Sequence, residues 1–259
     1  MTRRLLPLKR RKIDILGVGV DDFSQKEALG LILNLARDQK SAHYVVTVNS
    51  EFVMLARNNK DFADILQKAD LALPDGWWLA KSKLILGGRG RERIAGVDLL
   101  ENLCKEADKK AITVGFLGGF GSVAHRVAKR QKSRFLNLKI GYAGPGNPAI
   151  GYDPRLKNAL DKAGRIDILF VAYGMGQQEF WIARNLKKLN VGVLIGVGGA
   201  FDYISRVKRR APVLLQNTGL EWLWRLIYEP QRIWRMRVLP IFLLLVILKF
   251  LKLKISYKS

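Results

Sequence analysis

An aspartate in the segment Leu73-Pro74-Asp75-Gly76 is the first residue whose surroundings point to chemistry. It ends a short apolar run, so we expect its carboxylate at the end of a strand. There it can take a proton from an attacking hydroxyl group, provided that it stays ionised. Pro-Asp-Gly is also a common turn sequence. Asp75 is therefore a candidate general base, with a plain turn residue as the alternative.

Two polar residues, Thr47 and Asn49, close the β-branched run 44–48. Side chains alternate along a strand, so these two face the same side. Both can hydrogen-bond a sugar or a nucleotide. An asparagine at this place can also cap a following helix, a role that needs no ligand. The pair predicts a binding site only together with other residues.

Two glycine-rich turns follow apolar runs later in the chain. Gly118 and Gly119 stand in the first turn, and Gly198, Gly199 and Asp202 stand in the second. Glycine lets the backbone approach a phosphate, and a helix that begins after the turn offers free N–H groups and positive potential. The first turn lacks the Lys-Ser/Thr pair of a P-loop. A tight strand-to-helix turn explains its glycines equally well.

Three arginines, Arg225, Arg232 and Arg235, lie among tryptophans and leucines near the end of the chain. Guanidinium groups bind phosphate oxygens in a bidentate way, better than lysine does. The stretch therefore predicts a site for a phosphate-bearing ligand. The alternative is a solvated or lipid-facing basic stripe.

We expect no metal and no cofactor. His43 and His125 have no cysteine or carboxylate cluster at metal-ligand spacing, which argues against structural zinc. An Asp-x-Asp pair, which would hold a divalent ion against a diphosphate, is absent from the sequence. A GxGxxG turn with an acidic residue about 20 positions later is absent too, which argues against a dinucleotide-dependent oxidoreductase.

Short β-branched runs alternate with amphipathic stretches over most of the chain before Tyr203. This pattern predicts a Rossmann-like α/β fold, a mostly parallel sheet with helices on both faces. Ligands of such sheets bind outside the carboxyl ends of the strands, where the polar candidates stand. The predicted strands are 13–18, 44–48, 112–117, 168–172 and 191–197, and the predicted helices are 25–37, 51–67, 97–109, 123–132 and 178–189.

The composition changes after Tyr203. From there to the end, 12 basic residues face 2 acidic ones, and the whole chain carries a formal charge of +23. The apolar run 238–248 is shorter than the roughly 20 residues of a membrane span and has basic flanks, so we expect an interfacial anchor. A buried helix is the alternative. The predicted organisation is a basic segment 1–12, an α/β core 13–203 and a helical, basic membrane-binding appendage 204–259.

Two further class assignments follow from the composition. The positive charge lies next to apolar segments at both ends, not interleaved with aromatic residues in a recognisable module, so nucleic acid is not an expected partner. An anionic membrane surface is an expected partner. Cys104 is the single cysteine, so an intrachain disulfide cannot form.

Taken together, these segments resemble the WecG/TagA/CpsF family of bacterial glycosyltransferases. The similarity runs from about Ile13 to Arg237 and rests on the order and spacing of several motifs. They are TVNSEFVMLAR, LPDGWWLA, GRERIAGVDLL, GFLGGFGSVA, GMGQQEFWI, GVGGAFD and RAP followed by GLEWLWRLIYEPQRIWR.

The resemblance implies an inverting, metal-independent transfer of N-acetylmannosamine or a related sugar. The donor would be a UDP-sugar and the acceptor an undecaprenyl-diphosphate-linked sugar, at the cytoplasmic face of the membrane, for cell-surface polysaccharide or teichoic acid linkage units. Homo-oligomerisation stays open. The resemblance implies a base role for Asp75, site roles for Thr47, Asn49, Arg93 and Gln178, and lipid-diphosphate binding by Arg225, Arg232 and Arg235.

One motif departs from the family pattern. The family usually has Gly-x-Pro-Lys-Gln-Glu where this chain has Gly176 and Gln177 in place of the proline and lysine. A donor contact from that lysine is therefore not implied here. A membrane-associated nucleotide-sugar or anionic-ligand binding protein without transferase activity is the alternative function.

Overall fold

A parallel sheet of six strands organises the chain, whose computed structural model describes residues 11–90, 92–150 and 153–256. Most of the predicted basic segment 1–12 lies outside these residues. Neighbouring strands are all parallel, in the order β4-β3-β8-β7-β5-β6. The strands are β3 (His43–Val48), β4 (Leu71–Pro74), β5 (Thr113–Gly118), β6 (Lys139–Gly144), β7 (Ile166–Ala172) and β8 (Val191–Gly196).

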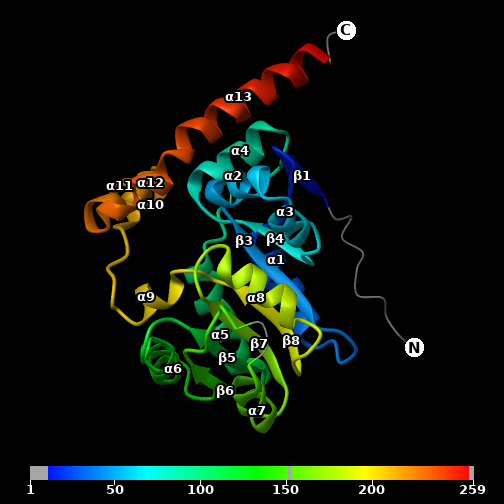
Figure 1. Cartoon of the computed structure of the whole chain (residues 1–259), viewed down its shortest axis with the longest axis vertical. Coiled ribbons are helices and arrows are strands. Elements are labelled where there is room, and N and C mark those ends of the chain that lie inside the picture. The colour runs from blue at the N-terminus through cyan, green and yellow to red at the C-terminus, as the bar shows by residue number, and fades with distance from the viewer. Residues whose placement is uncertain (1–10, 91, 151–152, 257–259) are drawn as a thin grey trace.

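Helices cover both faces of this sheet, as predicted (Figure 1). The first face packs against α1 (Gln25–Ala36), α5 (Gly96–Lys110), α6 (Val123–Arg134) and α9 (Ala200–Ile204). The second face packs against α2 (Ser50–Asn58), α3 (Lys60–Gln67), α7 (Pro154–Lys162) and α8 (Gln177–Asn185). Between β4 and α5 lies α4 (Trp77–Ile85).

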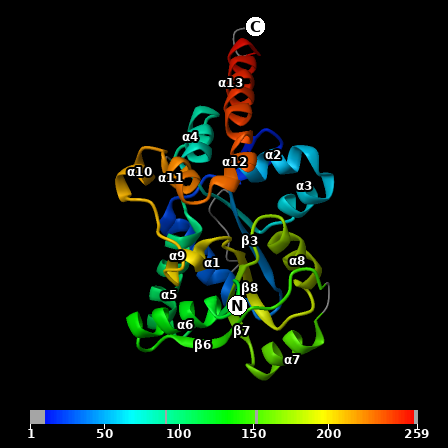
Figure 2. The ribbon, with the colours of Figure 1, turned by 60° about the vertical axis from the view of Figure 1, so that its left-hand side comes forward.

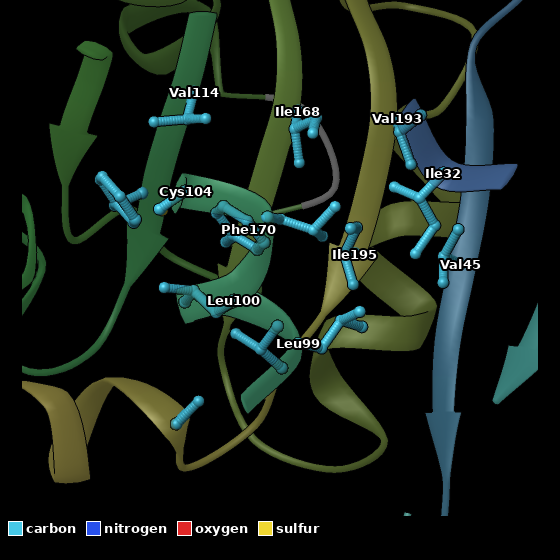
Figure 3. Close-up of a cluster of buried hydrophobic side chains, with 14 of the residues drawn as sticks. Ile32, Val45, Leu99, Leu100, Cys104, Val114, Ile168, Phe170, Val193 and Ile195 are labelled. Atoms are coloured by element: carbon cyan, nitrogen blue, oxygen red, sulfur yellow. The ribbon is translucent and has the colours of Figure 1, made fainter. Parts of the chain in front are cut away.

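The central strands are apolar on both sides, because both faces of a parallel sheet are covered. On the first face, alternate residues of β3, β5, β7 and β8 pack against α1 and α5 (Figure 3). Val45, Phe170 and Ile195 point into this layer, and each is fully buried. This packing fixes the strand ends, from which the candidate site residues project.

The predicted strand 13–18 is wrong in its extent and its sheet. The segment forms two antiparallel strands, β1 (Lys12–Ile15) and β2 (Val18–Asp21), in a separate hairpin. The chain reverses at Leu16, whose φ is +54°, and at Gly17. The Asp14 side chain accepts a hydrogen bond of 2.6 Å from the Gly17 N–H and so stabilises the turn.

The predicted helix 51–67 is also wrong, because the structure divides it into α2 and α3. Asn59 lies between them with extended backbone, φ −138° and ψ 104°. Its side chain accepts a 2.9 Å hydrogen bond from the Phe62 N–H, so it caps α3. An asparagine is favoured at such a cap over the interior of a helix.

The C-terminal appendage, residues 204–256, is helical, as predicted. Pro230 begins a new turn there, as its missing N–H requires. Figures 1 and 2 show its last helix projecting beyond the core. The elements are α10 (Val213–Asn217), α11 (Glu221–Tyr228), η1 (Pro230–Arg232), α12 (Ile233–Met236) and α13 (Val238–Ser256).

Helix α13 has one buried stripe and one exposed apolar side. Leu239, Phe242 and Val246 are buried, and the helix packs on α2 and α4. Leu244, Ile247 and other apolar residues on the remaining surface are about half exposed. No helix in the described part of the chain has both the length and the apolarity needed to cross a bilayer.

Candidate functional site

The site lies at the carboxyl edge of the sheet, between β3 and β8. These strands are neighbours, yet β3 leads into α2 on the second face and β8 leads into α9 on the first. The two connections therefore diverge and leave a crevice between them. Such a switch point is where ligands bind in open α/β sheets.

Two neighbouring cavities open along this edge. We call one the switch-point cavity; it is lined by the ends of β3 and β8, the start of α5 and the appendage. We call the other the tryptophan cavity; Trp77, Trp78 and Trp222 line it together with the first residues of α13. Both are lined by the same set of polar residues, which are Asn49, Glu51, Asp75, Glu221, Arg225, Arg232 and Arg235.

Asp75 therefore stands between the two cavities. Its backbone N–H donates a 2.7 Å hydrogen bond to the Val48 carbonyl, which continues the β3–β4 pairing by one residue. Burial, and then the negative charge of Glu221, raise the pKa of Asp75 to about 6, while Arg225 and Arg93 act to lower it. Asp75 is thus ionised at neutral pH, yet it is a stronger base than an ordinary aspartate.

Thr47 and Asn49 lie beside Asp75, as the strand-end argument predicts, and both line the switch-point cavity. The Thr47 hydroxyl donates a 3.0 Å hydrogen bond to the Gly196 carbonyl of β8. The Asn49 side-chain oxygen accepts a 3.0 Å bond from the Phe52 N–H and caps α2. Among the described residues nothing accepts a hydrogen bond from the amide nitrogen of Asn49, so the cap and the site role are compatible.

Gln178 is a buried connector behind the switch-point cavity. Its side-chain oxygen accepts a 3.0 Å hydrogen bond from the Gly198 N–H, and its nitrogen donates a 2.7 Å bond to Glu179. Gln178 therefore fixes the turn after β8. Gly198, Gly199 and Asp202 of that turn line the cavity, in agreement with their predicted place.

The turn with Gly118 and Gly119 lies outside the lining of both cavities. The Gly119 N–H donates a 2.9 Å hydrogen bond to the Ala172 carbonyl, and a Cβ on Gly118 would lie 2.6 Å from that oxygen. Close packing of β5 against β7 thus accounts for these glycines. Phosphate binding at this turn stays a prediction.

Every predicted diphosphate-binding arginine has a carboxylate partner. Arg225 pairs with Glu221, four residues before it, and Arg232 pairs with Glu229 at 3.1 Å. Arg235 pairs with Glu51 of α2 at 2.7 Å. The three arginines nevertheless converge on the cavities, which brings the predicted set together.

Arg93 reaches the site from the loop before α5. Its guanidinium donates to Glu221 at 2.7 Å and to the side-chain oxygen of Gln216 at 2.9 Å. Arg93 lines the tryptophan cavity, so the predicted site arginine lies beside Asp75. It also binds the appendage to the core.

The turn before α11 packs directly on the tryptophans. The Gly219 carbonyl accepts a 3.2 Å hydrogen bond from the Trp78 indole N–H. Gly219 has φ +80°, and a Cβ there would lie 2.7 Å from the Trp77 ring. Glycine is therefore required, and the tryptophan cavity depends on this contact.

Sequence reasoning missed several residues of the cavities. The first turn of α5 faces the switch-point cavity through Ala95, Gly96 and Val97, and no side chain in the described part of the chain caps its N–H groups. An uncapped helix start of this kind attracts anions. The signal was present, since Ala95-Gly96 precedes an amphipathic helix. Sequence reasoning also missed Glu51, Glu221 and Glu229, because only the three-dimensional structure shows that each of them pairs with an arginine.

The altered motif at Gly176 has a structural counterpart. Gly176 precedes α8 with φ +85°, a value that the ring of proline cannot adopt. Its N–H donates a 2.7 Å hydrogen bond to Glu179. Burial raises the pKa of Glu179 to about 7.

Among the described residues, no group of three or more His, Cys, Asp or Glu side chains is placed to hold a metal ion.

Comparison with known proteins agrees with this arrangement. The model of the glycosyl transferase WecG/TagA/CpsF family matches residues 13–256. A protein of Bacillus spizizenii (strain ATCC 23059 / NRRL B-14472 / W23) is 33% identical over 225 residues, which are 85% of each chain. It is named N-acetylglucosaminyldiphosphoundecaprenol N-acetyl-beta-D-mannosaminyltransferase.

Two further relatives carry the same name. The protein of Bacillus subtilis (strain 168) is 33% identical over 213 residues, 81% of each chain. The protein of Staphylococcus aureus (strain NCTC 8325 / PS 47) is 26% identical over 233 residues, 90% of this chain and 91% of the relative. The family match at residues 13–256 spans the core and extends through the appendage.

Proposed function

The chain belongs to the WecG/TagA/CpsF family of glycosyltransferases, and we propose that it transfers N-acetylmannosamine from a UDP donor to N-acetylglucosamine linked to undecaprenyl diphosphate. The sugars are those in the name of its relatives. The observation that carries the proposal is the place of Asp75, an ionised carboxylate between two cavities that share it. One cavity can hold a donor and the other an acceptor.

Asp75 acts as the general base in this proposal. It takes the proton of the acceptor hydroxyl while that oxygen forms a bond to the anomeric carbon of the donor sugar. The bond from that carbon to the UDP oxygen breaks at the same time, and UDP leaves with the electron pair. Attack from the side opposite the leaving group inverts the anomeric centre. A positioned base contributes roughly 10²–10⁴-fold to the rate.

The donor fits the switch-point cavity. Its diphosphate can lie against the N–H groups that begin α5, and its sugar can meet Thr47 and Asn49. The cationic side chains of Arg225 and Arg232 line the same cavity and can stabilise the charge that develops on UDP. We therefore propose a metal-independent reaction, in which these groups do what a divalent ion does in other transferases.

The acceptor fits the tryptophan cavity. Indole rings pack well on sugar rings, and Met236, Val238 and Leu239 extend the cavity toward α13. The exposed apolar side of α13 continues outward from that point. A lipid-linked acceptor can thus lie with its sugar near Asp75 and its prenyl chain along α13. We propose peripheral attachment at the cytoplasmic face of the membrane, where α13 meets the lipid.

A donor screen tests the proposal directly. The purified chain is given a set of UDP-sugars and a short-chain lipid-diphosphate-N-acetylglucosamine acceptor, with and without excess chelator, and the products are read by mass spectrometry. We expect one added N-acetylhexosamine, in chelator as well. Binding of UDP without any product in the presence of a proven acceptor would favour the binding protein without transferase activity.

A further inference from the structure

Glu221, in the first turn of α11, joins the appendage to the core at the site. One of its carboxylate oxygens accepts a 2.7 Å hydrogen bond from Arg93 of the core. The other accepts a bond from Arg225 of its own helix. Glu221 lines both cavities together with Asp75. A single carboxylate thus holds two guanidinium groups next to the proposed base.

Two other carboxylates, Glu229 and Glu51, also pair with arginines of the appendage, but each holds a single arginine. Glu229 pairs with Arg232 at 3.1 Å and with Lys208 at 3.0 Å, so all its partners belong to the appendage. Glu51 pairs with the exposed Arg235. Glu221 differs from both in holding two guanidinium groups, one from the core and one from the appendage, and its charge acts on Asp75.

We propose that Glu221 is a positioning residue for the transfer: its carboxylate draws Arg93 and Arg225 to the side of Asp75 and offsets their positive charge there. The proposal rests on the proposed role of Asp75. It assigns Glu221 no contact with the reacting atoms.

The ionisation of Glu221 supports this role. Burial acts to raise its pKa, but the charges of Arg225 and Arg93 outweigh burial and lower the pKa below the ordinary value. Glu221 is therefore charged whenever Asp75 is. Two arginines without it would favour the ionised form of Asp75 strongly and weaken it as a base. Glu221 offsets this effect.

Arg225 keeps one donor for a ligand. Its Nε atom is buried and has no hydrogen-bond partner among the described residues. Its guanidinium also stacks over the Tyr203 ring, 5.4 Å from the ring centre. Held by Glu221 and Tyr203, Arg225 is fixed before an anionic substrate arrives, which lowers the cost of binding one.

The charged residues around Asp75 determine which variants can distinguish a specific effect of Glu221 from the general effect of any nearby charge. Asp202 and Lys208 face the switch-point cavity from the first face of the sheet. The charged residues that line the cavities around Asp75 are Glu51, Arg93, Asp202, Lys208, Arg210, Glu221, Arg225, Glu229, Arg232 and Arg235. Glu221→Gln removes one charge of this set with little change in shape, and Glu229→Gln is its matched control.

The experiment follows Asp75 itself by carbon-13 NMR of the carboxyl groups in the full chain, with the resonance assigned by its loss in Asp75→Asn. In Glu221→Gln we expect the titration midpoint to move from about 6 toward 3.8, the value of an ordinary aspartate. Glu229→Gln should leave it in place. An unchanged midpoint in Glu221→Gln, or an equal shift in Glu229→Gln, overturns the proposal.

Kinetics give the second readout. The acid limb of the pH–rate profile should move to lower pH in Glu221→Gln, and the rate at neutral pH should fall about 10- to 100-fold, a part of what a positioned base supplies. Glu221→Asp keeps the charge but shortens the reach. This variant should keep the titration midpoint of Asp75 near 6 and raise the KM for the acceptor.

Thermal unfolding shows whether each variant is folded. If Glu221→Gln does not fold, Glu221→Asp carries the test, and a midpoint near 3.8 in that variant contradicts the proposal. The NMR titration does not depend on turnover. An active Asp75→Asn enzyme would therefore refute the proposed base, whereas an unmoved titration would refute the role of Glu221.

Discussion

The α/β core and the appendage are held by different forces. Strands of the core are buried on both faces, and β8 has no exposed residue among those described. The described helices α10, α11 and α12 have no fully buried residue. They are joined to the core by ion pairs, such as Arg210 with Asp98 and Arg93 with Glu221, and by the buried stripe of α13.

This difference divides the work at the site. Tight packing holds Asp75 and the strand ends in place, and a base needs such precise positioning. Arg235, in contrast, is exposed and pairs with Glu51 at the surface, where ion pairs are weak and exchange partners easily, which suits a residue that must receive a charged lipid. A change at Asp75 should therefore abolish the chemistry, whereas a change at an arginine of the appendage should mainly weaken use of the acceptor.

The largest expected effect comes from the core. Asp75→Asn keeps the shape of the side chain but cannot accept the proton. We expect the transfer rate to fall roughly 10²–10⁴-fold, because that is what a positioned base contributes. UDP binding and the unfolding temperature serve as controls. A folded variant that binds UDP and transfers at nearly the normal rate would show that another group is the base.

The arginines of the appendage should show a smaller, acceptor-specific effect. In Arg225→Ala, Arg232→Ala and Arg235→Ala, each change removes a charge-assisted contact worth about 1.5–3 kcal/mol. We expect the acceptor KM to rise about ten- to a hundredfold in each variant, with the donor KM much less affected. In Arg225→Ala and Arg232→Ala we expect kcat to fall as well, because these two arginines also face the departing UDP. Equal increases in the donor KM and the acceptor KM would contradict the proposal that the core and the appendage have different roles at the site.

The pH dependence sharpens the comparison. Below its pKa of about 6, Asp75 is protonated and cannot act as a base. The rate constant kcat/KM should therefore fall about tenfold for each pH unit on the acid side. The measurement is a pH–rate profile with unfolding temperatures at each pH. A flat profile between pH 5 and 8 (a range of about three units) would exclude Asp75 as the titrating group.

The exposed side of α13 gives a test of membrane attachment. Leu244→Ser removes one large apolar side chain that is 57% exposed. Burial of such a side chain in lipid is worth about 1.5 kcal/mol, so binding to anionic liposomes should weaken about tenfold. Phe242→Ser, on the buried stripe of the same helix, should lower the unfolding temperature instead. Co-sedimentation and thermal unfolding separate the two effects.

The smallest effect is expected at the opposite edge of the sheet. His43 lies between Asp70 at 3.1 Å and Asp38 at 3.0 Å. The hydrogen bond with Asp70 is the main cause that raises the pKa of His43, while burial acts against it. A raised pKa in the folded state stabilises the protein below the unfolded value and loses this effect as pH rises through the folded value.

His43→Asn should thus destabilise the chain by about 1 kcal/mol or less, and more at pH 6 than at pH 9. Urea unfolding at the two pH values measures the difference. Transfer activity at a pH where both proteins are folded should not change, because the amino edge is far from the site. A larger loss at the alkaline pH would mean that neutral His43 is the stabilising form.

The fold could be predicted where the sequence pattern is local. Val45, Phe170 and Ile195 stand in compact β-branched runs, and such runs fit a sheet that is covered on both faces. The edge strand β6 was missed because its segment KIGYAG has two glycines and a lysine, and Ile140 and Tyr142 are its only β-branched and aromatic residues. The hairpin was missed because Leu16 adopts a positive φ, which its residue type disfavours.

The site could be predicted only in part for a similar reason. Asp75 and Asn49 follow strands directly and Thr47 lies near the end of β3, so the topology alone brings them together. Glu221 and Arg93 are 128 residues apart, and their pairing depends on how the appendage folds back on the core. A charge run in a sequence does not identify its partner. Tertiary packing determines which carboxylate meets which arginine.

Helix α13 begins at the wall of the tryptophan cavity and ends in an exposed segment that carries Lys252 and Lys254. An enzyme held at a bilayer by such a helix meets its lipid acceptor by diffusion in two dimensions. The relevant acceptor concentration is then the mole fraction in the surface, and dilution with inert lipid should slow transfer even when the bulk amount of acceptor is constant. The soluble donor would still show ordinary saturation. The rate would then depend on the bulk concentration of the donor and on the surface concentration of the acceptor.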